Sequence, residues 1–127
     1  MIFNTNKEKG NTALGMAIAY FTSQGYTVSI PLNDTQDYDL IVEKDKTLKT
    51  VQVKSSGCKT KNNYFQVALK SCGGTKGTTY KTFTETSVDL LFIFLKDNSM
   101  YLFPANGITN LSTITLSPKY TKYLVTF

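Results

Sequence analysis

Several residue types that carry common enzyme chemistry are missing from this sequence. The 127 residues include no histidine, which excludes Ser-His-Asp triads, Cys-His dyads, histidine general bases and histidine-ligated zinc. Cys58 and Cys72 are too few to complete a tetrahedral zinc site, and we expect both to be free thiols. An active site in this chain would therefore be built from carboxylates, amides, hydroxyl groups and lysines.

Long apolar segments are also missing. No apolar run approaches the ~20 residues that a membrane helix needs, and the N-terminus lacks the apolar core of a secretion signal. With 41% hydrophobic residues, the composition is that of an ordinary globular protein, and the length suits one domain over residues 1–127. We therefore expect a cytoplasmic single-domain protein with no membrane contact.

Arginine is absent as well, so lysine alone supplies the positive charges behind the net charge of +5. Lysine binds phosphate as a mobile point charge, whereas arginine binds it in a bidentate manner. A basic surface suits a nucleic-acid partner. The same charge also serves solubility, and charge alone favours neither interpretation.

One segment, residues 5–24, has the pattern of an amphipathic helix. Thr5 or Asn4 can cap its start, and Glu8 lies in its first turn, where an acidic residue is favourable. Gly25 follows at a position suited to ending the helix. Apolar residues recur at helical spacing and should face the core: Leu14, Ala17, Ile18 and Phe21.

Strand patterns dominate the rest of the chain. They lie at residues 26–30, 37–43, 49–56, 63–69, 88–95, 100–103, 111–116 and 123–127. Residues 88–95 form the strongest apolar run, which predicts a central strand covered on both faces. The Gly-, Lys- and Thr-rich residues 70–81 are predicted to form a loop. The pattern predicts an α+β domain, with the helix, a mostly antiparallel sheet and extra C-terminal strands.

Asp39 and, one hairpin later, Gln52 and Lys54 form the most informative combination of residues. If Asp45 and Lys46 make a two-residue turn, antiparallel pairing places Asp39 opposite Gln52. Gln52 and Lys54 then point to one face of their strand, because side chains alternate with period two. The hairpin thus predicts a carboxylate, an amide and an amine close together.

These groups can serve metal-dependent cleavage of a phosphodiester. Mg²⁺ prefers oxygen ligands, and Asp39, Gln52 and the Val53 carbonyl could supply them. Lys54 could orient or deprotonate the attacking water and stabilise negative charge. Glu8 could complete the acidic group if the helix packs beside the hairpin. Residues at this spacing also occur on solvent-exposed strands that have no catalytic role.

Two further aspartates are alternatives to these residues. Asp37 shares a strand face with Asp39 and is the main rival ligand, although a turn role is favoured. Asp89 opens the apolar strand and is interpreted as a structural hydrogen-bond acceptor.

The order of these motifs resembles the PD-(D/E)XK nuclease superfamily. A helix with Glu8 precedes residues 38–42 (Tyr-Asp-Leu-Ile-Val), residues 51–56 (Val-Gln-Val-Lys-Ser-Ser) and residues 88–90 (Val-Asp-Leu). Within the superfamily, the sequence is most similar to small homing endonucleases associated with group I introns, which are themselves similar to archaeal Holliday-junction resolvases. The resemblance extends over residues 5–105.

The resemblance implies a restriction-endonuclease-like core, with the N-terminal helix packed on a mixed sheet. It also implies a DNA endonuclease that uses Mg²⁺, or Mn²⁺, and no organic cofactor. Asp39 would be the metal-binding aspartate, Lys54 the motif lysine and Glu8 the helix glutamate of resolvase-like members. Gln52 stands where most members have Asp or Glu, although intron-associated members also carry Gln. Tyr38 stands where a proline usually precedes the aspartate.

Predicted DNA contacts follow the catalytic strand, in segments that combine basic, hydroxyl and aromatic side chains. They are Ser55, Lys59, Lys61, Lys76, Tyr80 and Lys81. A chain of this size has little surface to read a long site, so we expect a homodimer or higher oligomer. Alternatives are a Holliday-junction resolvase-like nuclease, a catalytically inactive DNA-binding module and a subunit with no role on DNA.

Overall fold

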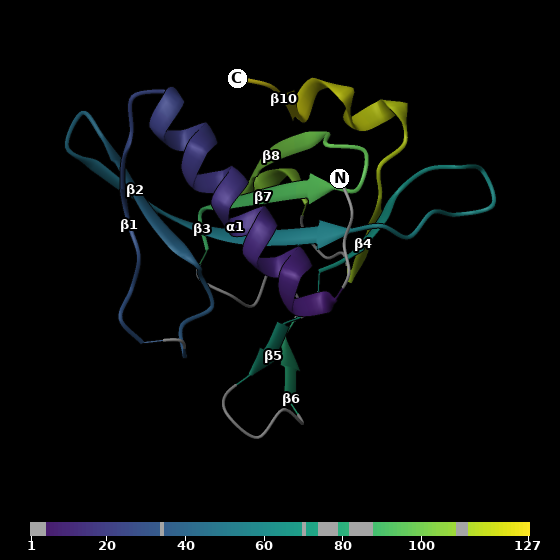
Figure 1. The fold of residues 1–127 in the computed structure, drawn as a ribbon, viewed down its shortest axis with the longest axis horizontal. Helices are drawn as coiled ribbons and strands as arrows, with labels where there is room; N and C mark the ends of the chain where they lie inside the picture. Colours follow the sequence, from purple (N-terminus) through teal and green to yellow (C-terminus); the bar gives the residue numbers. More distant parts are fainter. Residues whose placement is uncertain (1–4, 34, 70, 74–78, 82–87, 109–111) are drawn as a thin grey trace.

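The computed structural model describes residues 5–33, 35–69, 71–73, 79–81, 88–108 and 112–127. It is an α+β fold in which one α-helix, α1 (Asn6–Ser23), lies across a sheet (Figure 1). The strands are β1 (Thr27–Ser29), β2 (Leu40–Lys44), β3 (Thr47–Ser56), β4 (Gln66–Ala68), β5 (Ser71–Gly73), β6 (Thr79–Lys81), β7 (Leu90–Leu95), β8 (Met100–Pro104), β9 (Thr113–Thr115) and β10 (Leu124–Val125). Two 3₁₀ helices, η2 (Ala105–Gly107) and η3 (Pro118–Tyr123), follow β8 and β9.

Helix α1 confirms the predicted N-terminal helix and has a reciprocal cap. The Thr5 hydroxyl accepts the Glu8 N–H at 3.1 Å, and the Glu8 carboxylate accepts the Thr5 N–H at 3.1 Å. Gly25 follows the helix at a φ of +87°, which favours glycine. No helix in the described part of the chain is long and apolar enough to cross a bilayer.

The main sheet has six strands in the order β1-β2-β3-β7-β8-β10. Only β3 and β7 pair in parallel among these neighbours, so the sheet is mixed and mostly antiparallel, as predicted. Parallel strands need a long crossover, and the segment that contains β4, β5 and β6 supplies it. Residues 91–95 of β7 are all buried, which confirms the predicted central strand.

The β2–β3 hairpin has the predicted turn and register. Asp45 and Lys46 both have positive φ, at 52° and 63°, as a two-residue type I′ turn requires. Leu40 pairs with Val51, which is the register that the two-residue turn predicts. Strand β3 continues beyond Val51, whereas its pairing with β2 ends there. The hairpin therefore leaves one edge of β3 open towards its carboxyl end.

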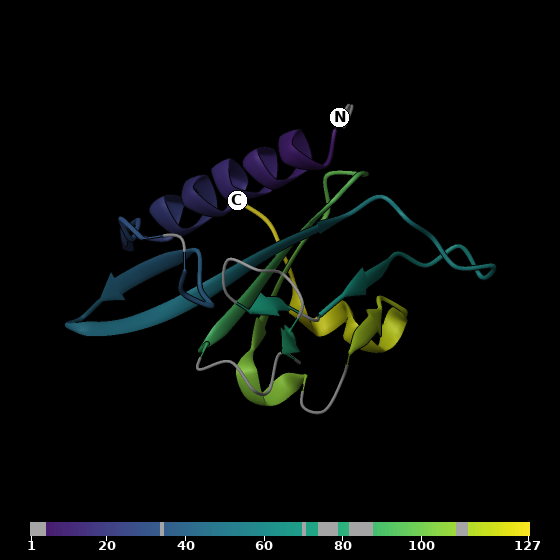
Figure 2. The same cartoon turned by 90° about the horizontal axis from the view of Figure 1, so that it is seen from below.

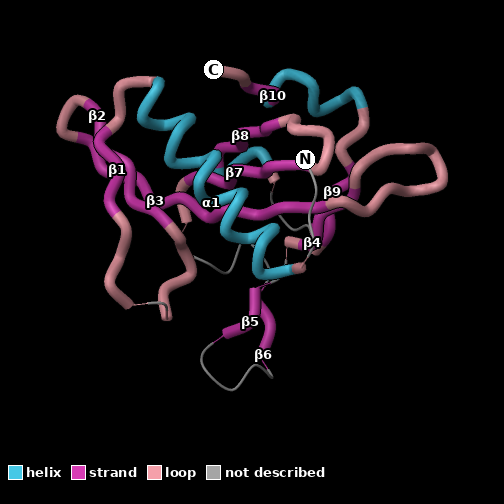
Figure 3. The backbone as a smooth tube through the Cα atoms, in the orientation of Figure 1, coloured by secondary structure: helices cyan, strands magenta, loops and turns pink. Residues whose placement is uncertain are grey.

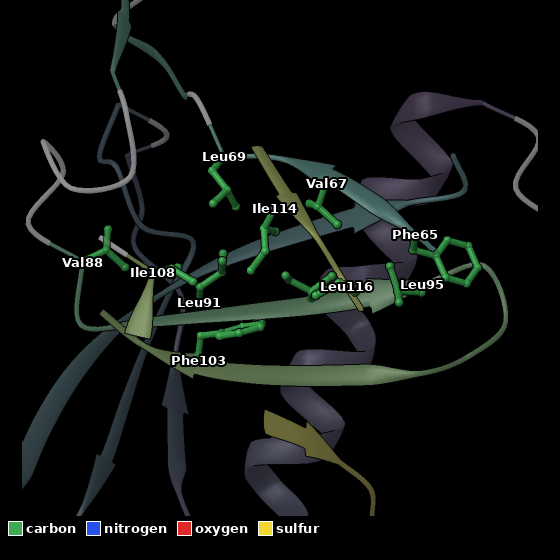
Figure 4. Close-up of a cluster of buried hydrophobic side chains, with 11 residues drawn as sticks. Phe65, Val67, Leu69, Val88, Leu91, Leu95, Phe103, Ile108, Ile114 and Leu116 are labelled. Atoms are coloured by element: carbon green, nitrogen blue, oxygen red, sulfur yellow. The ribbon is translucent and has the colours of Figure 1, made fainter. Parts of the chain in front are cut away.

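A hydrophobic cluster fills each face of the sheet. Helix α1 covers one face, and β4 and β9 lie side by side on the other (Figures 2 and 3). The cluster under α1 includes the predicted Ala17 and Phe21, with Leu14 and Ile18 packed against it. The cluster on the far face is shown in Figure 4, where Leu91 of β7 and Ile114 of β9 lie close together.

Strands β4 and β9 therefore contribute the far layer among the described residues. This layer explains why Leu91, Ile93 and Leu95 are as fully buried as the residues that face α1. The extra C-terminal strands predicted from sequence take part in the layers, since β9 pairs with β4 and β10 pairs with β8.

The prediction of a loop throughout residues 70–81 was wrong. Residues 71–73 and 79–81 pair as the antiparallel strands β5 and β6. Glycine and threonine here hide the apolar alternation by which a strand is usually recognised. The backbone hydrogen bonds of a short hairpin do not need that alternation.

Candidate active site

Asp39 lies just before β2, at the point where β2 and β3 separate. We call this point the β2–β3 fork, formed by Asp39, Val51 and Val53. The Asp39 N–H donates to the Val51 carbonyl at 2.8 Å. Its carboxylate oxygen Oδ2 accepts the Val53 N–H at 2.7 Å, a length typical of a hydrogen bond to a charged group. The carboxylate thus takes the place of a strand at the open edge of β3.

The alternation of β3 decides which way each nearby side chain points. Val51 and Val53 belong to the cluster under α1, so Gln52 and Lys54 point to the opposite face. The backbone N–H and carbonyl groups alternate between the two edges of the strand instead of its two faces. Val53 directs its N–H to the fork, and its carbonyl is directed to the same side of the strand. The fork therefore brings together the Asp39 carboxylate and the Val53 carbonyl.

Gln52 is buried on the strand face that also carries Lys54. Its amide Nε2 donates to the Asp37 carbonyl at 3.0 Å, and this bond fixes the plane of the amide. The side-chain oxygen Oε1 is buried as well. Asp37 takes part in this contact through its backbone carbonyl, and a part for its carboxylate as a rival metal ligand stays a prediction.

Lys54 and Asp39 interact electrostatically in a poorly solvated part of the molecule. Loss of solvation raises the pKa of Asp39 above its ordinary value, while the Val53 N–H and the charge of Lys54 oppose that rise. Loss of solvation also lowers the pKa of Lys54, and the charge of Asp39 opposes that change. Each group favours the charged form of the other in surroundings that disfavour charge.

The donor set at the fork fits a hard divalent cation. The fork has the Asp39 carboxylate and the Val53 carbonyl, and Gln52 carries an amide oxygen on the adjoining face of β3; all three are oxygen donors of the kind that Mg²⁺ binds. In the described part of the chain, no group of three or more acidic, cysteine or histidine residues lies close enough to hold a metal. Neutral oxygens would thus complete the set around Asp39.

Glu8 is at the start of α1, on the helix that covers the other face of the sheet. Its carboxylate forms the reciprocal cap with Thr5. The sequence signal for that cap, a threonine followed three residues later by glutamate, is present in residues 5–8. A part for Glu8 in binding metal stays a prediction.

The predicted DNA contacts lie in separate parts of the fold. Ser55 is half-buried on β3, and Lys59 and Lys61 are exposed in the segment after it, with Lys59 Nζ 4.7 Å from the centre of the Phe65 ring. Tyr80 and Lys81 belong to β6, whose hairpin with β5 projects in another direction (Figure 1). Lys76 lies outside the described residues.

Asp89 has the structural role that the sequence predicted. Its carboxylate Oδ2 accepts the Thr50 N–H at 2.9 Å and the Thr50 hydroxyl at 3.3 Å. These bonds tie the start of β7 to β3. Cys58 is a free, exposed thiol, also as predicted.

Comparisons with known proteins match this chain to a protein family and to a solved structure. A family model described as PD-(D/E)XK endonuclease matches residues 4–119. The solved structure of I-Ssp6803I, described as a bacterial homing endonuclease, is similar with a TM-score of 0.79 and 25% identity. The similarity covers 95% of this chain and 89% of that one. No curated protein sequence gives a significant match.

Proposed function

Because this chain belongs to the PD-(D/E)XK endonuclease family, we propose that the β2–β3 fork is the active site of a metal-dependent DNA endonuclease. The observation that carries this proposal is the position of Asp39. Its carboxylate is held by the Val53 N–H at the open edge of β3, next to the backbone of the motif lysine, Lys54. Family membership makes the protein a nuclease, and the residues, metal and substrate that follow are our proposal.

The Asp39 carboxylate, the Val53 carbonyl and Gln52 Oε1 would hold Mg²⁺, or Mn²⁺. Such an ion supplies positive charge for the phosphate oxygens and makes water more acidic. Asp39 provides the only formal negative charge of this set, so the site depends on it. Gln52 contributes an oxygen whose direction is fixed by the bond from Nε2 to Asp37. Glu8 could add a carboxylate through water.

Lys54 would act on the proton of the attacking water or on the charge of the phosphate. Its lowered pKa increases the fraction of neutral amine at a given pH, and only the neutral amine accepts a proton. The charged form would stabilise the negative charge that develops on the phosphate. Both roles require Lys54 on the same side of β3 as Asp39, and their electrostatic interaction supports this.

For the substrate, we propose double-stranded DNA cut in the manner of a homing endonuclease. The similarity to a bacterial homing endonuclease over most of both chains supports this choice, as does the lysine-derived net charge of +5. We also propose a homodimer or higher oligomer, because one chain of 127 residues offers little surface to read a long site. Light scattering of the purified protein tests the oligomeric state.

A cleavage assay on linear and branched duplexes, with Mg²⁺ or with EDTA, tests the activity. We expect cleavage of linear duplex that requires the metal and is lost in Asp39→Asn and Lys54→Met. Glu43→Gln is the matched control, since it removes one exposed carboxylate from the same hairpin. It should retain activity.

The alternatives predict different outcomes of the same assay. Cleavage confined to branched DNA would indicate a Holliday-junction resolvase-like enzyme. Binding without cleavage of any substrate would indicate an inactive DNA-binding module. Full activity in Asp39→Asn would refute the assignment of the site.

A further inference from the structure

A cavity of about 480 Å³ opens beside the carboxyl end of β3, beyond the β2–β3 fork. Lys9 of α1 lines one side of it, and Thr113 of β9 lines another. Ser55, Gly57 and Cys58 line it from the end of β3 and the segment that follows. The cavity thus lies where the helix layer, the open strand edge and the far layer meet.

Partly buried hydrogen bonds shape this cavity. The Ser56 hydroxyl donates to the Gln66 carbonyl at 2.6 Å and accepts the Cys58 N–H at 3.2 Å. The Gln66 N–H in turn donates to the Cys58 carbonyl at 3.0 Å. These bonds hold the end of β3 and Cys58 against the start of β4, and they form one wall of the cavity.

The lining chemistry suits an anion. Lys9 is the only charged side chain among the described residues that line the cavity, and no carboxylate is present there. Ser55 and Thr113 add hydroxyl groups, which can donate to phosphate oxygens. One cation with neighbouring hydroxyl donors is a common combination in contacts to the DNA backbone.

The position of the cavity along β3 relates it to the fork. Backbone groups of alternate residues point to the same edge, so the N–H and carbonyl of Ser55 face the open edge as those of Val53 do. Two residues of strand span about 6.6 Å, a distance of the order that separates successive phosphates of one DNA strand. A phosphate at the fork would therefore place its neighbour beside Ser55.

We propose that this cavity binds a backbone phosphate of DNA, the one next along the strand from the phosphate at the fork. The inference rests on the proposed function, because it takes the fork as the place of cleavage. Lys9 would neutralise the phosphate, and Ser55 and Thr113 would donate hydrogen bonds to it. Lys9 and Thr113 thereby become positioning residues for the strand that is cut.

Cys58 provides a direct reporter, since it is an exposed free thiol on the cavity wall. The measurement is the rate of alkylation of Cys58 by iodoacetamide in a Cys72→Ser background, with EDTA to prevent cleavage. The probe is a short random-sequence duplex at saturating concentration. Saturation keeps the fraction of bound protein equal between variants, so a change in rate reports the cavity and not the affinity.

We expect bound duplex to slow alkylation several-fold. Lys9→Ala and Thr113→Glu should restore the rate of the free protein, the first by removing the cation and the second by adding a negative charge. Lys49→Ala, which removes an exposed lysine from the start of the same strand, should leave the protection intact. Lys9→Ala should also reduce the slope of log affinity against log salt by about 0.9.

The results separate this inference from the proposed function. Cleavage of DNA without protection of Cys58, or equal behaviour of Lys9→Ala and Lys49→Ala, would overturn the phosphate site and leave the nuclease. Protection that depends on Lys9 in a protein that cuts no DNA would support the site and overturn the activity. A duplex that does not bind at all would overturn both.

Discussion

Replacement of Asp39 should separate the two roles of its carboxylate at the β2–β3 fork. The group accepts the Val53 N–H at 2.7 Å, and it carries the negative charge that a metal would need. Asp39→Asn keeps an oxygen acceptor but removes the charge, whereas Asp39→Ala removes both. Both variants should lose about a hundredfold or more of the cleavage rate, but they should differ in stability.

The expected difference follows from the hydrogen bond to Val53. The neutral hydrogen bond that Asn can keep contributes about 0.5–1.5 kcal/mol net, and loss of the acceptor leaves a donor unsatisfied at a cost of about 1–3 kcal/mol. Part of the Asp39 residue reaches the surface although its carboxylate is poorly solvated, so water replaces the acceptor only in part, and the lower part of that range applies. We expect Asp39→Asn to be more stable than Asp39→Ala by about 1 kcal/mol, or roughly 3–6 °C in Tm for a domain of this size.

The same variants test the surroundings of the carboxylate through pH. Desolvation raises the pKa of Asp39 in the folded state, so the folded protein binds this proton more readily than the unfolded chain. The resulting stability is complete below the unfolded pKa of about 3.9 and is lost as pH rises through the folded pKa. Wild type should therefore gain stability relative to Asp39→Asn as pH falls from about 7 to about 4.

Urea denaturation of the metal-free proteins across this pH range measures both effects. Equal stability of Asp39→Asn and Asp39→Ala at neutral pH would show that the contact with Val53 has no energetic weight. Relative loss of wild-type stability on acidification would show that attraction by Lys54 and Val53 outweighs desolvation. Lys54 and the Val53 N–H would then already stabilise the charged carboxylate, and the fork would have less tendency to bind a cation.

Three further predictions address the metal, the base and the core. Lys54→Arg keeps the charge but cannot accept a proton, so the cleavage rate should fall about 10²-fold or more. The variant should also lose any rise of the rate with pH that the lowered Lys54 pKa causes, and an unchanged pH–rate profile would contradict this. Gln52→Glu should lower the Mg²⁺ concentration for half-maximal cleavage, which a metal titration measures. Burial of the added charge should lower the free energy of unfolding without metal, which urea denaturation measures. Phe92→Ala should lower the free energy of unfolding by about 3–5 kcal/mol, because Phe92 is fully buried under α1; a loss below about 1 kcal/mol would mean that the cluster relaxes around the cavity.

Local features of the candidate site could be predicted from the sequence because short-range rules decide them. The turn at Asp45 and Lys46 sets the register of the hairpin, and the register brings Asp39 to the strand that carries Gln52 and Lys54. Period-two alternation then decides the faces of the strand. Neither step depends on residues far away in the chain.

The DNA contacts could not be predicted as one group for a physical reason. Lysines near in sequence need not be near in space when a hairpin separates them, and the β5–β6 hairpin, whose second strand includes Lys81, projects away from the segment that follows β3. The cavity beside β3 shows the converse, since Lys9 and Thr113 are more than a hundred residues apart and line the same space.

Local sequence patterns were enough to predict the helix, the hairpin register, the apolar central strand and a chemistry without histidine. Each of these depends on neighbouring residues, through capping, turn geometry, periodicity or composition. Three features became visible only in the folded chain: β3 pairs in parallel with β7, β4 and β9 cover the far face, and no described strand pairs with the edge of β3 beyond Asp39. These features depend on pairing between distant segments, where burial of whole faces, and not local preference, selects the partner.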